Sequence, residues 1–160
     1  MIKSYRFKKY YQAHQEFVRV TIYWMVRSEV ANDLVQETFI KAWKNFDNFN
    51  HKSSFKTWIY RIAMNTTYDY LRGVKESTTE VEMTSDSFED GLELKDLLDY
   101  ALSQIDLNSR EVFVLYFKLE YSIKEIGEIL GIPEGTVKSR LFKAREKIGQ
   151  ILKENGVDHA

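Results

Sequence analysis

The stretch SIKEIGEILGIPEGTVKSRLFKARE, residues 122–146, places two short amphipathic patterns on either side of a Gly-Ile-Pro turn. Ser122, with Glu125 three residues later, matches a capping box and predicts the start of a helix. Gly131 suits the left-handed position that ends a helix, and Pro133 suits the start of the next one. Two helices joined by so short a turn predict a helix-turn-helix.

The second helix of this pair has an apolar row that is expected to pack against its own domain. The row consists of Val137, Leu141, Ala144 and Ile148. Small, polar and basic residues remain outside, and a helix that reads DNA enters the major groove by its N-terminal part. The residues predicted to contact DNA are Glu134, Gly135, Thr136, Lys138, Ser139, Arg140 and Lys143. The alternative is that basic residues late in a helix only suit its dipole, which would explain Arg145 and Lys147.

The net charge of −1 over 160 residues conceals an uneven distribution. Residues 1–75 hold 13 Lys and Arg against 6 Asp and Glu, whereas residues 76–99 hold 1 against 9. This asymmetry indicates basic surfaces separated by an acidic strip. The chain has no cysteine and only 1 proline, and helix formers are plentiful, which favours an all-α fold. No apolar run could span a bilayer and no signal core is present, so we expect a cytoplasmic protein.

The N-terminal half predicts three helices. The first covers the aromatic-rich residues 5–26, and the second follows Asn32 as N-cap. Its apolar row is Val35, Phe39, Ala42 and Phe46. Ser54 is predicted to cap the third helix, which would end at Gly73.

The C-terminal half adds two helices before the helix-turn-helix, one over about residues 92–105 and one through Phe117. Asn108, with Glu111 three residues later, resembles a capping box for the latter helix. We therefore predict two small helical domains, residues 1–75 and 96–156, joined by a flexible acidic linker over residues 76–95.

Two blocks of the sequence resemble the two domains of small bacterial RNA polymerase sigma factors of the extracytoplasmic-function class. The C-terminal block is LNSREVFVLYFKLEYSIKEIGEILGIPEGTVKSRLFKAREKI, and the N-terminal one combines DLVQETFIKAWKNFDNF with SSFKTWIYRIAMNTTYDYLR. The resemblance implies a factor that binds core RNA polymerase and directs it to promoter DNA. Its first domain would bind the polymerase clamp and the −10 element and help to melt the duplex, and its second would bind the −35 element.

The segment DLVQETF matches the clamp-binding part of the family. Opposite the apolar row of this helix lie Asp33, Gln36, Glu37 and Ile40, a mixed polar and apolar patch that suits a partner helix. The alternative is an ordinary solvated face with acidic residues near the helix N-terminus.

Melting a promoter requires aromatic surfaces, polar groups that reach base edges and a basic track. The residues assigned to the −10 element are Lys52, Ser53, Trp58, Arg61 and Asn65. The resemblance places Asn65 beside a pocket for a flipped base, although Asn65 could also be a plain surface residue. Trp58 is expected to pack more than to stack on bases. The acidic linker is expected to be solvated, or alternatively to mimic nucleic acid inside a positive channel of the polymerase.

Three other functions could suit a small helical protein with a helix-turn-helix. An enzyme is disfavoured, because His14, His51 and His159 lie far apart and no phosphate-binding motif occurs. A stand-alone DNA-binding regulator would need a dimerisation helix, and none is evident. A polymerase-binding adaptor that reads no promoter stays open. We expect no catalytic residue, cofactor or metal site and a monomer when free, and the resemblance implies an anti-sigma partner.

Overall fold

The computed structural model of the chain describes residues 2–77 and 94–157. All regular structure in these two ranges is helical, which confirms the predicted all-α class. The chain divides into one compact unit over Met1–Thr79 and another over Glu80–Ala160, and each is described by itself. Most of the predicted linker, residues 78–93, lies outside the described residues.

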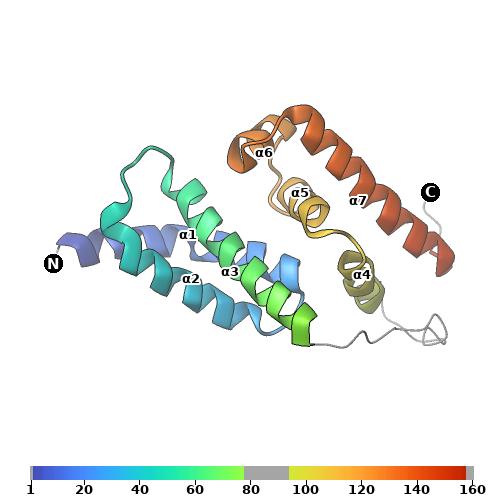
Figure 1. Cartoon of the computed structure of the whole chain (residues 1–160), viewed down its shortest axis with the longest axis horizontal. Helices are drawn as coiled ribbons and strands as arrows, with labels where there is room; N and C mark the ends of the chain where they lie inside the picture. The colour runs from blue at the N-terminus through green and yellow to red at the C-terminus, as the bar shows by residue number, and fades with distance from the viewer. Residues whose placement is uncertain (1, 78–93, 158–160) are drawn as a thin grey trace. The chain divides into compact units, whose positions relative to one another are not determined.

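The N-terminal unit is a bundle of three α-helices, each of which packs against the other two (Figure 1). The helices are α1 (Ile2–Val26), α2 (Ala31–Asn45) and α3 (Phe55–Ser77), with a short 3-10 helix η1 (Phe46–Asn48) after α2. The loop over residues 50–54 joins η1 to α3.

Aromatic side chains fill one end of this bundle. Phe55 at the start of α3 is buried, and its ring stacks on Tyr10 of α1 at a centroid distance of 4.2 Å. Phe46 and Phe49 pack edge-on against the same Phe55 ring, at 6.5 Å and 5.7 Å. Because aromatic rings bury large areas in specific geometries, this cluster fixes the start of α3 and the loop before it.

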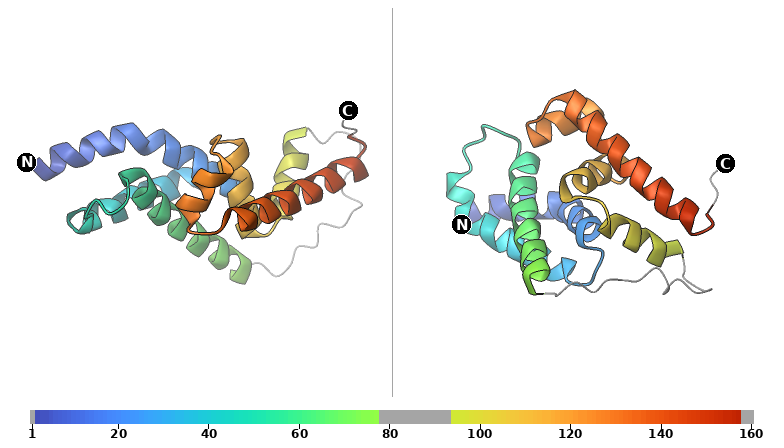
Figure 2. Two further views of the ribbon diagram at one scale, coloured as in Figure 1. Left: turned by 90° about the horizontal axis from the view of Figure 1, so that it is seen from above. Right: turned by 45° about the vertical axis from the view of Figure 1, so that its right-hand side comes forward.

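The C-terminal unit is built around its last helix. Its elements are α4 (Leu94–Ser103), α5 (Leu107–Phe117), α6 (Ile123–Leu130) and α7 (Glu134–Glu154), and α7 contacts the other three (Figures 1 and 2). All four residues of the predicted apolar row are buried: Val137, Leu141, Ala144 and Ile148. The row therefore packs as the sequence predicts.

Two predicted helix boundaries in the N-terminal unit are wrong. The N-cap of α2 is Val30, not Asn32, because the preceding turn already supplies acceptors: the Ala31 N–H donates to Ser28 O at 3.2 Å and the Asn32 N–H donates to Glu29 O at 3.3 Å. Helix α3 does not end at Gly73 but continues to Ser77. A glycine ends a helix by adopting a left-handed conformation, and Gly73 does not adopt it.

The predicted capping box at Asn108 is also wrong. Asp106 is the N-cap of α5, and its carboxylate accepts a hydrogen bond from the Ser109 N–H at 3.1 Å. Asn108 lies inside the helix, and Glu111 is buried. Asp is as good an N-cap as Asn, so residue type alone does not favour Asn108 over Asp106.

Candidate polymerase and nucleic-acid interfaces

The turn of the helix-turn-helix has the geometry that its sequence predicts. Ser122 and Glu125 form the complete capping box, and Gly131 adopts the left-handed conformation, with φ 67° and ψ 37°. The Ile132 N–H donates to Gly127 O at 3.0 Å. A Cβ on Gly127 would lie 2.9 Å from Ile132 O, so this close approach requires glycine. These contacts fix the direction in which α7 leaves the turn.

The first turns of α7 present an open surface of small and basic groups. Lys138 and Ser139 are exposed, and Thr136 and Arg140 are half-buried. A Cβ on Gly135 would meet nothing within 4 Å, and its φ is not positive. The protein's own packing therefore does not require glycine at this position.

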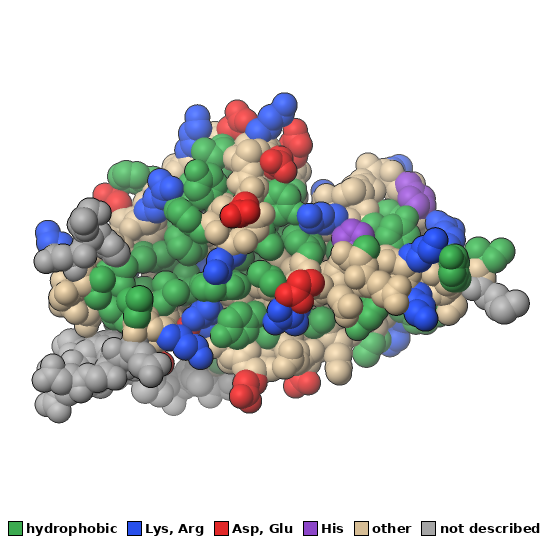
Figure 3. Space-filling model, turned by 180° about the vertical axis from the view of Figure 1, so that it is seen from behind, with side chains coloured by type: hydrophobic (Ala, Val, Ile, Leu, Met, Phe, Trp, Pro, Cys, Tyr) green, Lys and Arg blue, Asp and Glu red, His purple; other side chains and the backbone are tan. Residues whose placement is uncertain are grey.

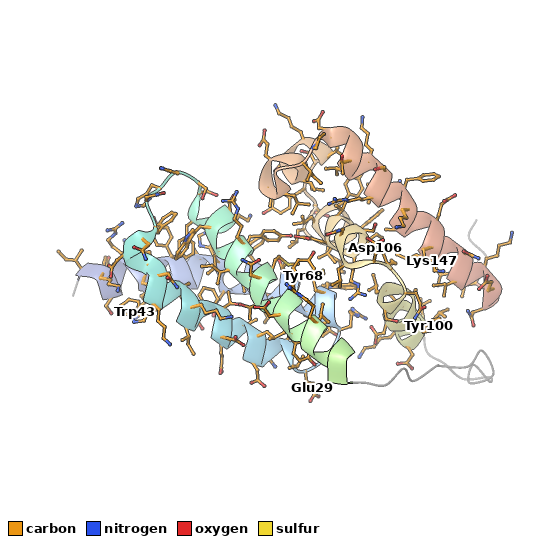
Figure 4. All side chains as sticks on the ribbon, in the orientation of Figure 1. Glu29, Trp43, Tyr68, Tyr100, Asp106 and Lys147 are labelled. Carbon is orange, nitrogen blue, oxygen red and sulfur yellow. The ribbon has the colours of Figure 1, made fainter. Side chains whose placement is uncertain are left out.

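Lys143, another of the predicted DNA contacts, has a carboxylate partner within the unit. Its Nζ lies 3.1 Å from Asp106 Oδ1, and Figure 4 shows Asp106 at the start of α5. Burial raises the pKa of Asp106, but hydrogen bonding from Ser109 and the Lys143 ammonium together outweigh burial, so this pKa lies below its usual value. The Lys143 side chain is still 71% exposed, so its ammonium can reach other anions as well.

The loop of residues 50–54 is held in a defined shape by local contacts. Asn50 Oδ1 accepts a hydrogen bond from the Lys52 N–H at 3.1 Å, and His51 adopts a left-handed conformation with φ 59°. Ser54 Oγ accepts from the Thr57 N–H at 3.2 Å, which confirms the predicted cap of α3. Lys52 is exposed and Ser53 half-buried, so the loop offers polar groups at the edge of the bundle.

Three of the residues assigned to the −10 element share one face of α3. Trp58, Arg61 and Asn65 follow each other at spacings of three and four, which brings them to the same side of a helix. Arg61 and Asn65 are exposed. Trp58 is half-buried against the aromatic cluster, with its ring 5.0 Å from Phe49. Its packing agrees with the expectation that it supports the core more than it offers a stacking surface.

The outward face of α2 is acidic and apolar. Asp33, Gln36 and Glu37 are exposed, and Ile40 is 54% exposed. Ile40 also lines a shallow apolar pocket of about 460 Å³ with Trp43 and, from α1, Tyr11; Figure 4 shows Trp43 toward the C-terminal end of α2. Glu37 pairs with Lys41 at 2.9 Å, and Lys41 Nζ in turn donates to Thr66 Oγ1 of α3 at 3.2 Å. This face is suited to another protein rather than to DNA.

A helix-turn-helix with an open, basic helix start defines a protein that reads duplex DNA, and the N-terminal bundle adds a face suited to a protein partner. Two family models match in this order: Sigma-70 region 2 over residues 10–76 and Sigma-70, region 4 over residues 95–148. The ECF RNA polymerase sigma factor SigW of Bacillus subtilis is 37% identical over 142 residues, covering 78% of this chain and 76% of that relative.

A second relative, the ECF RNA polymerase sigma factor SigM of Bacillus subtilis, is 33% identical over 137 residues and covers 81% of this chain and 83% of its own length. A solved structure, the sigma factor RpoE in complex with the anti-sigma factor NepR from Bartonella quintana, is similar with a TM-score of 0.69 and 28% identity, covering 92% of this chain and 97% of that one. The chain therefore belongs to the extracytoplasmic-function sigma factors of the sigma-70 family. As such it is a non-catalytic subunit that directs RNA polymerase to promoters.

Two features of these surfaces were not predicted from the sequence. Asp106 was not assigned to the site, although an Asp before an apolar run is a recognisable N-cap signal. Arg6 of α1 lies beside the loop of residues 50–54, and no local pattern links residues 45 positions apart.

Within residues 2–77 and 94–157, no helix is both long enough and apolar enough to cross a bilayer.

Proposed function

We propose that this sigma factor divides its work among three surfaces. The outward face of α2, with Asp33, Gln36, Glu37 and Ile40, binds the polymerase clamp. The −10 element binds the loop of residues 50–54 and the α3 face, through Lys52, Ser53, Trp58, Arg61 and Asn65. The −35 element binds the start of α7, through Glu134, Gly135, Thr136, Lys138, Ser139, Arg140 and Lys143. The first two surfaces belong to residues 1–75 and the third to residues 96–156.

The observation that carries this proposal is the open start of α7. The buried row of α7 accounts for one side of the helix, and the opposite side places Lys138 and Ser139 in solvent beside Gly135. Lys and Arg donate to guanine edges and phosphates, and a hydroxyl donates to either. A dipole role alone would not require small residues at the exposed first turn.

We infer that α2 is the polymerase surface from its chemistry. Exposed Ile40 and Trp43 supply an apolar centre, and the acids and amide of the same helix supply polar contacts around it. The Lys41–Thr66 hydrogen bond ties this helix to α3, so the surface is presented by a rigid pair of helices. A partner that binds α2 is thereby coupled to the helix that would hold the −10 strand.

An anti-sigma protein is the further partner that we propose. The structural relative from Bartonella quintana was solved with one, and its identity to this chain is 28%. The exposed apolar side chains of α2 are a natural target, because covering Ile40 would block polymerase binding directly. The factor would then be held in the cytoplasm as an inactive heterodimer and act as a monomer once released. In the linker, the acidic charge is proposed to pass through a positive channel of the polymerase.

Reconstitution with core RNA polymerase and genomic promoter fragments tests the proposal. We expect promoter-specific open complexes, detected by permanganate reactivity of unpaired thymines, and none with the sigma factor alone. Tight specific DNA binding without polymerase would support a stand-alone regulator instead. Polymerase binding without promoter selection would support an adaptor.

Two variants separate the surfaces. Arg140→Ala is expected to weaken promoter affinity of the holoenzyme by about 1–3 kcal/mol and to leave core affinity unchanged. Glu37→Ala is expected to weaken core affinity by about 1 kcal/mol and to leave the promoter preference of the assembled holoenzyme unchanged. The matched controls are Lys147→Ala on α7 and Glu29→Ala before α2, both exposed. Equal losses from both variants in both assays would contradict separate surfaces.

A further inference from the structure

The first turns of α1 run beside the loop that we assign to the −10 element. Lys3 Nζ pairs with Asp47 Oδ2 of η1 at 2.9 Å. Arg6 Nη2 lies 3.4 Å from His51 Nε2, and because a guanidinium has no acceptor, the imidazole nitrogen must accept. These two contacts bring the N-terminal part of α1 to the edge of the residue 50–54 loop.

This part of α1 is basic and contains no acid. Between Ile2 and Gln15 the sequence has four basic residues, and the first acidic residue of the chain is Glu16. In Figure 3 the blue Lys and Arg side chains at the right-hand end of the view gather beside a purple histidine, and no red acidic side chain is visible among them. Unbalanced positive charge on this scale attracts a polyanion.

The basic residues divide between two flanks of the helix. Arg6 reaches the loop through its contact with His51, and Lys9 follows three positions later along the helix; both are exposed. Lys8 lies on the other flank, where it lines the pocket shared with Ile40 and Trp43 of α2. The proposed polymerase surface and the basic flank are thus on different sides of α1.

The basic flank also carries an exposed aromatic ring. Tyr5 is 62% exposed, and Lys9 Nζ lies 4.9 Å from its ring centroid. Proteins that hold single-stranded nucleic acid combine cations along the backbone with aromatic rings on which bases stack. A protein partner would not require this combination next to a base-reading loop.

We propose that Arg6, Lys9 and Tyr5 extend the −10 site along α1 and hold the unpaired promoter strand as it leaves the loop, with Arg6 on a phosphate. This inference rests on the proposed function of the loop and adds α1 to it. The contact from Arg6 to the His51 imidazole is long, at 3.4 Å, and a phosphate oxygen would give Arg6 a shorter, charge-assisted hydrogen bond instead.

The test uses the full-length protein in holoenzyme with core polymerase. The probe is the non-template-strand oligonucleotide that covers the −10 region of a promoter found in the open-complex experiment, and affinity is measured over a salt series. Arg6→Ala should lower affinity by about threefold to tenfold and reduce the slope of log K against log salt by about 0.7, the value for one phosphate contact on a single strand. Arg6→Lys, which keeps the charge, should restore the slope.

Arg19→Ala is the matched control, because it removes a guanidinium from an exposed position of α1, paired with Glu16 of the same helix and more than three turns from Arg6, and should leave the slope unchanged. Lys9→Ala should also reduce the slope, and because the Lys9 ammonium contacts the Tyr5 ring of its own helix, the change leaves the Arg6–His51 contact with the loop in place. A changed base preference with an unchanged slope in Arg6→Ala would overturn the proposal and make Arg6 a residue that only positions the loop.

Equal slopes for wild type, Arg6→Ala and Lys9→Ala would likewise overturn the proposal, even if each holoenzyme forms open complexes. Failure of the wild-type holoenzyme to form any promoter-specific open complex is a different result. It would overturn the proposed function itself, and this inference with it.

Discussion

The two units reach a defined shape by different means. In the N-terminal unit, large aromatic rings from α1, η1 and α3 pack around Phe55, and the loop beside them follows from this packing. In the C-terminal unit, the direction of α7 is set by backbone features at the turn: a capping box, a left-handed glycine and a glycine in close contact with a carbonyl. Hence the shape of the 50–54 loop depends on the packing of buried rings, and the direction of α7 depends on local backbone geometry.

The difference extends to what each unit leaves exposed. The outward face of α2 combines acids with exposed Ile40 and Trp43, whereas the start of α7 combines small residues with bases. Both helices bury an apolar row of similar spacing, so the row itself does not reveal the partner. The exposed residues distinguish the two helices. Those of α2 are acidic and apolar, which suits a protein partner, and those at the start of α7 are small and basic, which suits DNA.

The largest expected effect is at the aromatic cluster. Phe55→Ala removes a buried ring that contacts the rings of Tyr10, His14, Phe46, Phe49 and Trp58, and we expect the free energy of unfolding of the N-terminal unit to fall by about 3–5 kcal/mol. All three tryptophans lie in this unit, so urea unfolding followed by tryptophan fluorescence reports on it. Phe142→Ala, which removes a ring that is 62% exposed, should change stability by no more than about 0.5 kcal/mol. Similar losses would show that ring burial is not what distinguishes the units.

The next effect is at the turn of the helix-turn-helix. Gly127→Ala places a Cβ 2.9 Å from Ile132 O, so the backbone of the turn must shift, and we expect a loss of about 1–3 kcal/mol in the C-terminal unit. The control is Gly149→Ala within α7, where a Cβ meets nothing within 4 Å and should stabilise by about 0.5–1 kcal/mol. Amide hydrogen exchange of α6 and α7 measures both. If both substitutions changed the stability in the same direction, the close contact at Gly127 would not be what fixes the turn.

A smaller effect distinguishes the two cap candidates of α5. Asp106→Ala removes the acceptor of the Ser109 N–H and should lower the free energy of unfolding by about 1 kcal/mol. Asn108→Ala, inside the helix, should stay within about 0.5 kcal/mol of wild type. Urea unfolding followed by far-UV circular dichroism compares them. A larger loss of unfolding free energy for Asn108→Ala than for Asp106→Ala would indicate that Asn108 is the N-cap of α5.

The smallest effect is on pH dependence. Because the pKa of Asp106 is lowered in the folded chain, its ionised form stabilises the fold at pH values above the ordinary carboxyl pKa of about 4, and this contribution is lost as the pH falls below it. Asp106→Asn keeps a good N-cap but loses the charge. We expect its urea midpoint to lie slightly below that of wild type at pH 7 and to coincide with it near pH 3. A gap that widens in acid would show that the carboxylate is not stabilised by Ser109 and Lys143.

The sequence could predict the helix-turn-helix in detail because its signals are local. The box at Ser122, the glycine at 131 and the proline at 133 each act within one turn of chain, and the structure places each where it was expected. The errors at Asn32 and Asn108 are also local, since a nearby residue caps each helix instead, and at Gly73 the helix continues through a glycine that does not adopt a left-handed conformation. The family resemblance indicated which segments would bind polymerase and which would bind DNA. The assignment of individual side chains to these surfaces stays a prediction.

Long-range contacts could not be predicted in this way. Arg6 meets His51 and Lys3 meets Asp47 only because the aromatic cluster fixes α1 against η1, and residues 44 and 45 positions apart share no local pattern. Similarly, Lys143 was assigned to DNA from its place on α7 alone, and its ion pair with Asp106 depends on the packing of α5 on α7.

The open space around Gly135 has a consequence for promoter choice. A side chain can be added there without touching the rest of the protein, and the neighbouring outward positions of α7 also lie apart from the buried row. If the start of α7 binds the −35 element as we propose, a substitution at Gly135 would therefore alter promoter choice while the buried row of α7 stays unchanged. The residues that would determine promoter choice and the residues that stabilise the fold then lie on different sides of α7.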